Sequence, residues 1–199
     1  MNNYDLDKIK DTFSRLFVIA IDNKMNLLSF TTNLEQSFFV KRIERKELLN
    51  CINLPMEELF FRITGFHILD DTSFGVYNDA YWAGDRYFKL YLKLKKSFSY
   101  LFLKFPLEKM LECYKVYHEM DFSSLLEYFM EEEKKKTILR LLCINKHCSL
   151  TDLSKATNIP LNTLKRYNLN DEYLYNGSFK YVIKIKEYFD VSTSLFINE

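Results

Sequence analysis

The sequence predicts an α+β protein, in which an N-terminal mixed α/β domain with antiparallel hairpins precedes an all-α domain. Apolar and polar residues alternate between residues 87 and 105, as they do in half-buried strands. After Pro106 the apolar residues recur instead at helical spacing. The chain has only 4 Gly and 3 Pro in 199 residues, and 48% of its residues are hydrophobic, so it can fold around a sizeable core.

The N-terminal segment predicts a helix, a β-hairpin and two further helices. Residues 6–16 carry apolar side chains at three- and four-residue steps, which is typical of an amphipathic helix. Two apolar runs within residues 16–32 flank a polar tract at 22–24 that suits a turn, and this pattern predicts a hairpin. Residues 33–50 are rich in helix formers, and Pro55 suits the first turn of the helix that follows.

A second hairpin is predicted between residues 87 and 105. In the stretch 87–95, Phe and Leu occupy the even positions, while Tyr and Lys occupy the odd ones. This period of two predicts a strand with one buried face and one solvated face. A lysine pair then leads into the apolar stretch 97–105, which Pro106 ends. The two stretches therefore predict an antiparallel pair of strands.

The chain after Pro106 predicts helices only, and a run of charges divides them. Residues 107–120 form one predicted helix, and a longer one follows up to residue 145. Three Glu and three Lys at 131–136 suit a solvated connector in the middle of that longer helix. We therefore expect one domain over 1–130 and another over 131–199.

Residue types that usually perform catalysis or bind metals form no recognised pattern. The chain has no Gly-rich phosphate loop, no G-x-S-x-G elbow and no H-E-x-x-H motif. Cys143, His147 and Cys148 lie close together in the sequence, but a zinc site would need a distant fourth ligand. We therefore expect no enzyme, and neither a cofactor nor a metal site.

The cellular location is inferred from the cysteines and the apolar runs. The four cysteines show no close-spaced disulfide framework, which favours free thiols in a reducing compartment. The N-terminus is polar, and the apolar run at 16–21 is far too short to span a membrane. We expect a cytoplasmic protein without a membrane partner.

Residues 149–168 predict two short helices that are joined by a tight turn. Ser149 is a suitable N-cap for the first helix. Asn158 tolerates the left-handed backbone conformation that a turn requires. Ile159 supplies an apolar plug after the turn, and Pro160 suits the first turn of the second helix. This arrangement predicts a helix-turn-helix.

Apolar residues within and around this motif supply the core that it needs. Leu164 can pack back on Leu153, with the small Ala156 where the two helices cross. A preceding helix, a helix after a polar loop and a last apolar turn add to this core the side chains of Ile138, Leu139, Leu142, Phe179, Val182, Ile183, Ile185, Tyr188, Phe189, Val191, Leu195 and Phe196.

This order of elements resembles the Cro/C1 (XRE) family of helix-turn-helix proteins. The matching stretches are Ser149-Leu-Thr-Asp-Leu-Ser154, Asn158-Ile-Pro-Leu-Asn-Thr-Leu164 and Ile183-Lys-Ile-Lys-Glu-Tyr-Phe-Asp-Val-Ser192, with Leu195-Phe196. The resemblance covers about a third of the chain. It implies a five-helix, lambda-repressor-like domain. The sequence departs from the family pattern at Leu150, where a DNA-contacting Gln is common, and at Asn168-Leu-Asn170, where Glu-x-Gly is usual.

The resemblance implies a sequence-specific regulator of transcription, a repressor or autorepressor, that binds double-stranded DNA as a homodimer. Domain 1–130 would then serve dimerisation or partner binding. The charge distribution agrees with DNA binding, because residues 134–170 contain eight Lys or Arg and one acid, whereas the whole chain has a net charge of only +1.

The second helix of the motif is expected to enter the major groove and the flanking residues to contact phosphates. Asn can pair with adenine, and Leu or Thr methyl groups can contact thymine. The residues expected to contact bases are Leu161, Asn162, Thr163, Lys165 and Arg166. Those expected to contact phosphates are Lys146, Ser149, Thr151, Lys155 and Lys180.

An alternative function follows from a second resemblance of residues 153–165, to the helix-turn-helix of phage anti-CRISPR proteins. In those proteins one domain blocks a Cas9-type nuclease, while the helix-turn-helix represses its own operon. The basic and aromatic face of the predicted strand would then contact the nuclease or its guide RNA, since bases stack on aromatic side chains. An ordinary exposed strand with lysines at its edge explains the same pattern. The residues concerned are Trp82, Arg86, Lys89, Tyr91, Lys93 and Lys95.

Overall fold

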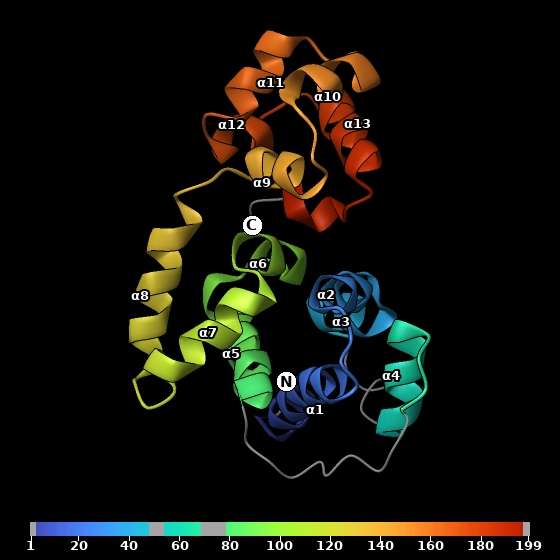
Figure 1. Ribbon diagram of the computed structural model, residues 1–199, viewed down its shortest axis with the longest axis vertical. Helices are drawn as coiled ribbons and strands as arrows, with labels where there is room; N and C mark the ends of the chain where they lie inside the picture. The colour runs from blue at the N-terminus through green and yellow to red at the C-terminus, as the bar shows by residue number, and fades with distance from the viewer. Residues whose placement is uncertain (1–2, 48–53, 69–78, 197–199) are drawn as a thin grey trace.

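The computed structural model describes residues 3–47, 54–68 and 79–196, and within these ranges it is all-helical. Figure 1 shows two groups of helices along the long axis of the molecule. The N-terminal region contains α1 (Asn3–Asp22), α2 (Leu27–Gln36), α3 (Phe38–Glu44), α4 (Met56–Thr64), α5 (Asp79–Leu94), α6 (Phe98–Lys104), α7 (Leu107–Tyr117) and α8 (Phe122–Glu133). The C-terminal region contains α9 (Ile138–Asn145), α10 (Leu150–Thr157), α11 (Leu161–Tyr167), α12 (Asp171–Tyr175), α13 (Phe179–Phe189) and the 3-10 helix η1 (Thr193–Phe196).

The predicted α+β class is wrong, because both hairpins of the N-terminal domain are helical. Helices α1 and α2 cover most of the hairpin predicted at 16–32, and only the polar turn between them is as expected. The hairpin predicted at 87–105 consists of α5 and α6. No strand, and therefore no sheet, is present within the described residues of the N-terminal region.

Helix α5 explains why the alternating pattern was misleading. Its buried residues include Ala80, Ala83, Tyr87 and Leu90, which are spaced by three or four residues, as on one face of a helix. Tyr87 was expected on the solvated face of a strand, yet it is fully buried. Leu92 was expected in the core, and it is 41% exposed. The period of two was a by-product of a helix whose apolar face is wide.

Serine caps divide the N-terminal chain into short helices. The Ser37 hydroxyl accepts a hydrogen bond from the Val40 amide at 3.2 Å, which starts α3 inside the helix predicted at 33–50. The remainder of that predicted helix extends beyond residue 47, outside the described residues. The Ser97 hydroxyl accepts from the Tyr100 amide at 3.2 Å and starts α6 in the same way. Both serines satisfy amide groups that a helix leaves without an intrahelical partner.

The core of the N-terminal region is built from aromatic rings. Phe13 lies 4.7 Å from Phe98 between ring centroids, and Phe17 lies 5.1 Å from Phe30. The backbones of α1 and α5 approach closely at Gly84, where a Cβ would lie 2.6 Å from the Cα of Ser14. Contacts between residues far apart in the sequence therefore determine this region.

A buried lysine joins the two regions. Lys104, at the end of α6, has a side chain that is only 2% exposed. Its ammonium donates to the carbonyls of Glu133 and Lys136 at 3.1 and 2.6 Å, and to the carboxylate of Asp171 at 2.6 Å. Asp171 also accepts from the amide of Ile138 at 2.7 Å. We call these groups the Lys104 hub, because they connect α6 to the end of α8, to the segment that leads into α9, and to α12.

Candidate nucleic-acid interface

Helix α10 begins with the cap that its sequence predicts. The Ser149 hydroxyl accepts a hydrogen bond from the Asp152 amide at 3.1 Å, and the Asp152 carboxylate accepts from the Ser149 amide at 3.0 Å. This reciprocal pair is a capping box. Hydrogen bonds from the Ser149 hydroxyl and amide lower the pKa of Asp152, so the carboxylate stays ionised at the N-terminus of the helix.

The turn after α10 has the geometry predicted for it. Asn158 adopts the left-handed conformation, with φ 53° and ψ 35°. Ile159 is buried, and its carbonyl accepts from the Ser154 hydroxyl at 2.6 Å. Pro160 immediately precedes α11. Lys184 on α13 donates to the Thr157 carbonyl at 2.6 Å, which holds the turn against the last helix.

The packing of the helix-turn-helix is as predicted at its large apolar residues and differs from the prediction at Ala156. Leu153 and Leu164 are both fully buried. Ala156, expected where the helices cross, is exposed instead. Thr157 is the buried residue at this end of α10, and its hydroxyl donates to the Leu153 carbonyl at 2.7 Å. The crossing therefore does not depend on a small residue.

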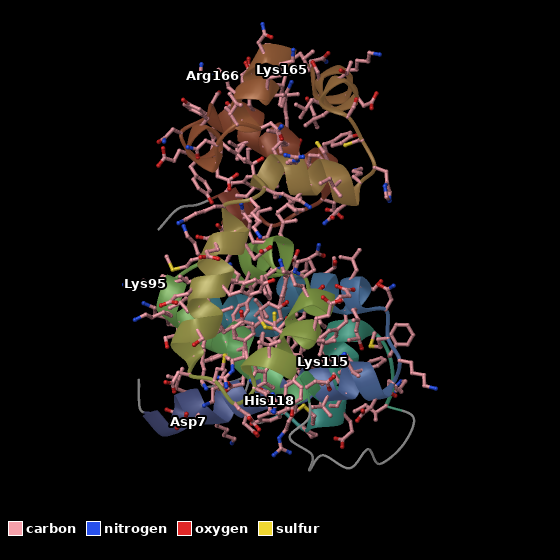
Figure 2. The ribbon with its side chains drawn as sticks, turned by 60° about the vertical axis from the view of Figure 1, so that its left-hand side comes forward. Asp7, Lys95, Lys115, His118, Lys165 and Arg166 are labelled. Atoms are coloured by element: carbon pink, nitrogen blue, oxygen red, sulfur yellow. The ribbon has the colours of Figure 1, made fainter. Side chains whose placement is uncertain are left out.

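Helix α11 exposes three of the five side chains that were predicted to contact bases. Leu164 and Tyr167 face the core, while Asn162, Lys165 and Arg166 are exposed. Leu161 and Thr163 are half-buried at the start of the helix. Figure 2 shows Lys165 and Arg166 at one end of the long axis, with Lys115 and His118 at the other. The N-terminal region therefore does not cover this face of α11.

The five residues predicted to contact phosphates fall into two groups. Thr151, Lys155 and Lys180 are exposed on α10 and α13. The Ser149 side chain is engaged in its capping box. The ammonium of Lys146 donates to the Tyr188 carbonyl and lies 4.3 Å from the centroid of that ring. The structure thus places Lys146 at the junction of the two regions, beside residues of α2.

The residues that depart from the Cro/C1 pattern have structural roles in this chain. Asn170 caps α12, because its side chain accepts from the Glu172 amide at 2.9 Å. The Thr137 hydroxyl lies 3.4 Å from the carbonyl and side-chain oxygens of Asn168. Leu150 is partly buried against the core. Helix α12 occupies part of the predicted polar loop, and it carries Asp171 of the Lys104 hub.

Helix α13 contributes less to the core than its sequence predicts. Ile185 is its fully buried residue, and Val182, Ile183, Tyr188 and Phe189 are half-buried. Phe179 was expected in the core but is 76% exposed. It is the first residue of α13.

The surface predicted on a strand is rearranged by the helical structure of α5. A helix turns by about 100° per residue, so Trp82, Arg86, Lys89 and Lys93 form one stripe. Tyr91 lies on the opposite side and stacks on Phe98, with 4.6 Å between ring centroids. Lys95 follows the end of α5, in a left-handed conformation. The predicted continuous face of six residues does not exist.

A pocket of about 400 Å³ lies on this stripe, between α1, α5 and α7. Asp85 neutralises part of its positive charge, since the carboxylate lies 2.8 Å from the ammonium of Lys89 and 3.4 Å from the guanidinium of Arg86. That guanidinium also lies 5.2 Å from the Trp82 ring. The cations of this pocket are therefore largely engaged with the protein itself.

The thiols of Cys143 and Cys148 in the C-terminal region interact with each other. Burial raises the pKa of Cys143 to about 12, and its neighbour Cys148 raises it further through charge and a hydrogen bond. Within 3–47, 54–68 and 79–196, no three His, Cys, Asp or Glu side chains are grouped as metal ligands would be. Cys113, Cys143 and Cys148 are free thiols.

Three residues with unusual environments carry no recognisable signal in the sequence. Lys104 and Asp171 form the hub, and Glu35 lies in a cavity at the junction. Lys104 lies in the apolar stretch that predicted a strand, Asp171 in the predicted polar loop, and Glu35 in the helix predicted at 33–50. Only the packing of distant helices gives these groups their environment.

Comparisons of the chain with protein-family models, with curated proteins and with solved structures found no match. Within the part of the chain that the structure describes, no helix is long and apolar enough to cross a membrane.

Proposed function

We propose that the protein is a sequence-specific, double-stranded DNA-binding regulator of transcription that acts as a repressor. One observation carries the proposal: α10 and α11 are joined by a left-handed turn at Asn158, and the polar face of α11 is exposed at the end of the molecule. A helix presented in this way fits the major groove of DNA.

The charges of the module support the proposal. None of the ion pairs among the described residues involves Lys155, Lys165, Arg166 or Lys180. Their positive charge is therefore available to DNA, and each phosphate that it neutralises would release a counterion. The guanidinium of Arg166 lies 5.3 Å from the Tyr173 ring, which orients it along the surface of α11.

The side chains at the start of α11 supply the sequence preference in this proposal. Asn162 is exposed and can accept from and donate to the edge of an adenine. The methyl groups of Leu161 and Thr163 suit contact with thymine. We therefore propose a target site that is rich in A·T pairs, with Lys165 and Arg166 further along the groove.

The proposal includes a homodimer, since two half-sites double the contact with DNA. Among the described residues, Phe179 and Leu169 are the most exposed large apolar side chains, at 76% and 75%. Both belong to the C-terminal region, and we propose them as subunit contacts.

Selection of bound duplexes from a random library, with the full chain as bait, tests the proposal. We expect an enriched motif, and binding to it that weakens as salt is raised. Asn162→Ala should weaken binding to the selected site about tenfold to a hundredfold and relax the preference at one base pair. Lys155→Ala, at a residue predicted to contact phosphates, should weaken binding to all duplexes and reduce the salt dependence by about one counterion.

Lys115→Ala is the matched control, because Lys115 is an exposed lysine at the opposite end of the molecule. It should leave binding unchanged. A full chain that shows no preference for any duplex over competitor DNA would contradict the proposal. Equal losses in Lys115→Ala and Lys155→Ala would show that binding is unspecific attraction to positive charge.

Inhibition of a Cas9-type nuclease stays an alternative prediction. The flat basic and aromatic face on which it depended is absent, because α5 is a helix. The stripe of Trp82, Arg86 and Lys89 is the surface that remains for such a contact. A nuclease inhibition assay with the full chain and with Arg86→Ala tests it.

A further inference from the structure

A cavity of about 300 Å³ lies where the N-terminal and C-terminal regions meet. One wall comes from α2 and α6, and the other from α9, the end of α13 and η1. Figure 1 shows α6 directly beside α9 at this junction. The apolar lining consists mainly of Leu28, Phe102, Leu103, Leu142, Phe189 and Leu195. Its size and lining are those of sites that hold small organic molecules.

Hydrogen bonds between the two regions hold the walls of this junction cavity together. The Gln36 side chain, at the end of α2, donates to the carbonyl of Asp190 at 3.5 Å. The Ser97 hydroxyl, before α6, donates to the carbonyl of Ser194 at 3.3 Å. The cavity therefore lies between two regions that are hydrogen-bonded to each other, and both regions would contact a bound molecule.

Glu35 places a carboxyl group in this apolar space. The Ser99 hydroxyl, which is itself buried, donates a hydrogen bond to it. No ion pair recorded among the described residues includes Glu35. Burial raises the pKa of Glu35 to about 7, and the nearby Glu44 carboxylate raises it too, whereas the hydrogen bond from Ser99 lowers it.

The other charged groups around the cavity do not compensate Glu35. Lys146 lines the cavity, but its ammonium donates to the Tyr188 carbonyl and lies over that ring. The remaining charged residue of the lining is Asp190, which is another acid. The cavity therefore combines an apolar wall with an excess of negative charge and lacks a cation beside Glu35.

We propose that the junction cavity binds a small organic cation, namely a protonated amine on an apolar body. The ammonium would donate to the Glu35 carboxylate, and the apolar body would lie against Phe102, Leu142 and Leu195. A buried carboxylate that gains a hydrogen-bonded cation is stabilised, whereas the free cavity leaves it uncompensated. Neutral or anionic molecules of the same shape lack this interaction.

The amine site does not depend on the proposed DNA binding. A regulatory role for the bound amine does rest on that proposed function. An occupant touches α2 and α6 on one side and α9 and α13 on the other, so it stabilises one arrangement of the two regions. In a DNA-binding regulator, such an occupant is an effector that changes the affinity for DNA.

Calorimetry on the full chain tests the site with pairs of probes that share an apolar body and carry either an ammonium or a neutral hydroxyl group. The amines are 2-phenylethylamine, cyclohexylmethylamine and hexylamine, and the partners are the alcohols with the same bodies. We expect at least one amine to bind about tenfold or more tightly than its alcohol, as a charge-assisted hydrogen bond provides. The proposal is overturned if no amine binds better than its alcohol.

Two variants identify the group that recognises the cation. Glu35→Gln keeps the size of the side chain and an acceptor for Ser99, and it should lower the affinity for the amine about tenfold without changing that for the alcohol. Asp190→Asn is the matched control, because Asp190 is left-handed and Asn tolerates that conformation. It should weaken amine binding much less than Glu35→Gln does, because the ammonium bonds to Glu35. If Asp190→Asn lost amine binding while Glu35→Gln kept it, the cation would be bound by Asp190, and the proposal would be overturned.

The pH dependence provides a second readout. The ammonium needs the ionised form of Glu35, whose pKa in the free protein is about 7. The amine should therefore bind about tenfold more weakly at pH 6 than at pH 8, and protons should be released on binding near pH 7. Glu35→Gln should show neither effect. A pH-independent affinity in the native protein would contradict the assignment.

The DNA and amine experiments fail separately. Amine binding without any DNA preference would leave the site in place and remove the proposed function. DNA binding without amine binding would do the reverse. If both occur, the affinity for the selected duplex should change when the amine is added, and it should not change in Glu35→Gln.

Discussion

The two regions of the molecule are stabilised in different ways. In the N-terminal region, rings of α1, α5 and α6 pack together, and Phe13, Phe17 and Tyr87 are fully buried. In the C-terminal region, short helices surround an aliphatic core that includes Leu153 and Leu164, and the turns between them are fixed by local caps. The N-terminal fold therefore depends on contacts that are distant in the sequence, whereas the helix-turn-helix is largely encoded within about twenty residues.

The Lys104 hub connects these two kinds of structure, and its loss should have the largest effect. Lys104→Met removes the cation from Asp171 and leaves two carbonyls without their donor. Breaking a buried ion pair from one side costs about 3–5 kcal/mol. We expect the free energy of unfolding, measured with urea, to fall by about that amount.

Lys93→Met is the control for the hub, since Lys93 is exposed and should change stability by no more than about 0.5 kcal/mol. A double variant, Lys104→Met with Asp171→Asn, should be less damaged than the sum of its parts, because the uncompensated carboxylate is gone. Additive losses would show that the two groups do not act together. Unfolding in two steps would show that the hub is what couples the regions.

The contrast between distant contacts in the N-terminal region and local signals in the helix-turn-helix explains which features the sequence predicts. The N-cap at Ser149, the left-handed Asn158 and the buried Ile159 are local signals, and the structure confirms each of them. Tyr87 and Leu92 have the opposite exposure from that expected, since α1 and α7 decide which face of α5 is covered. Glu35 was not predicted as a site because its surroundings come from α6 and the C-terminal region.

Disturbing the contact between α1 and α5 should lower the free energy of unfolding by an intermediate amount. Gly84→Ala would place a Cβ 2.6 Å from the Cα of Ser14, which is backbone and cannot move aside. Overpacking of this kind costs about 1–3 kcal/mol. Urea denaturation should show this loss, and it should exceed that of Gly65→Ala, where no atom lies within 4 Å and only the φ of +75° is unfavourable. The reverse order would mean that α1 and α5 adjust easily, contrary to a fold set by their contact.

The smallest loss of stability is expected at Asn158, in the turn that the sequence predicts best. Asn158→Ala replaces the polar side chain that lets Asn tolerate φ 53° by a methyl group, and the loss is at most about 1–2 kcal/mol, the cost of the left-handed conformation for an ordinary residue. Asn158→Gly should be nearly neutral, since Gly adopts this conformation freely. Amide hydrogen exchange of α10 and α11 measures the loss, and protection of α1 and α5 should be unchanged if the turn is a local element. Equal losses in both regions would instead show that the helix-turn-helix is stabilised through the Lys104 hub, so that its folding is less independent than its sequence signals indicate.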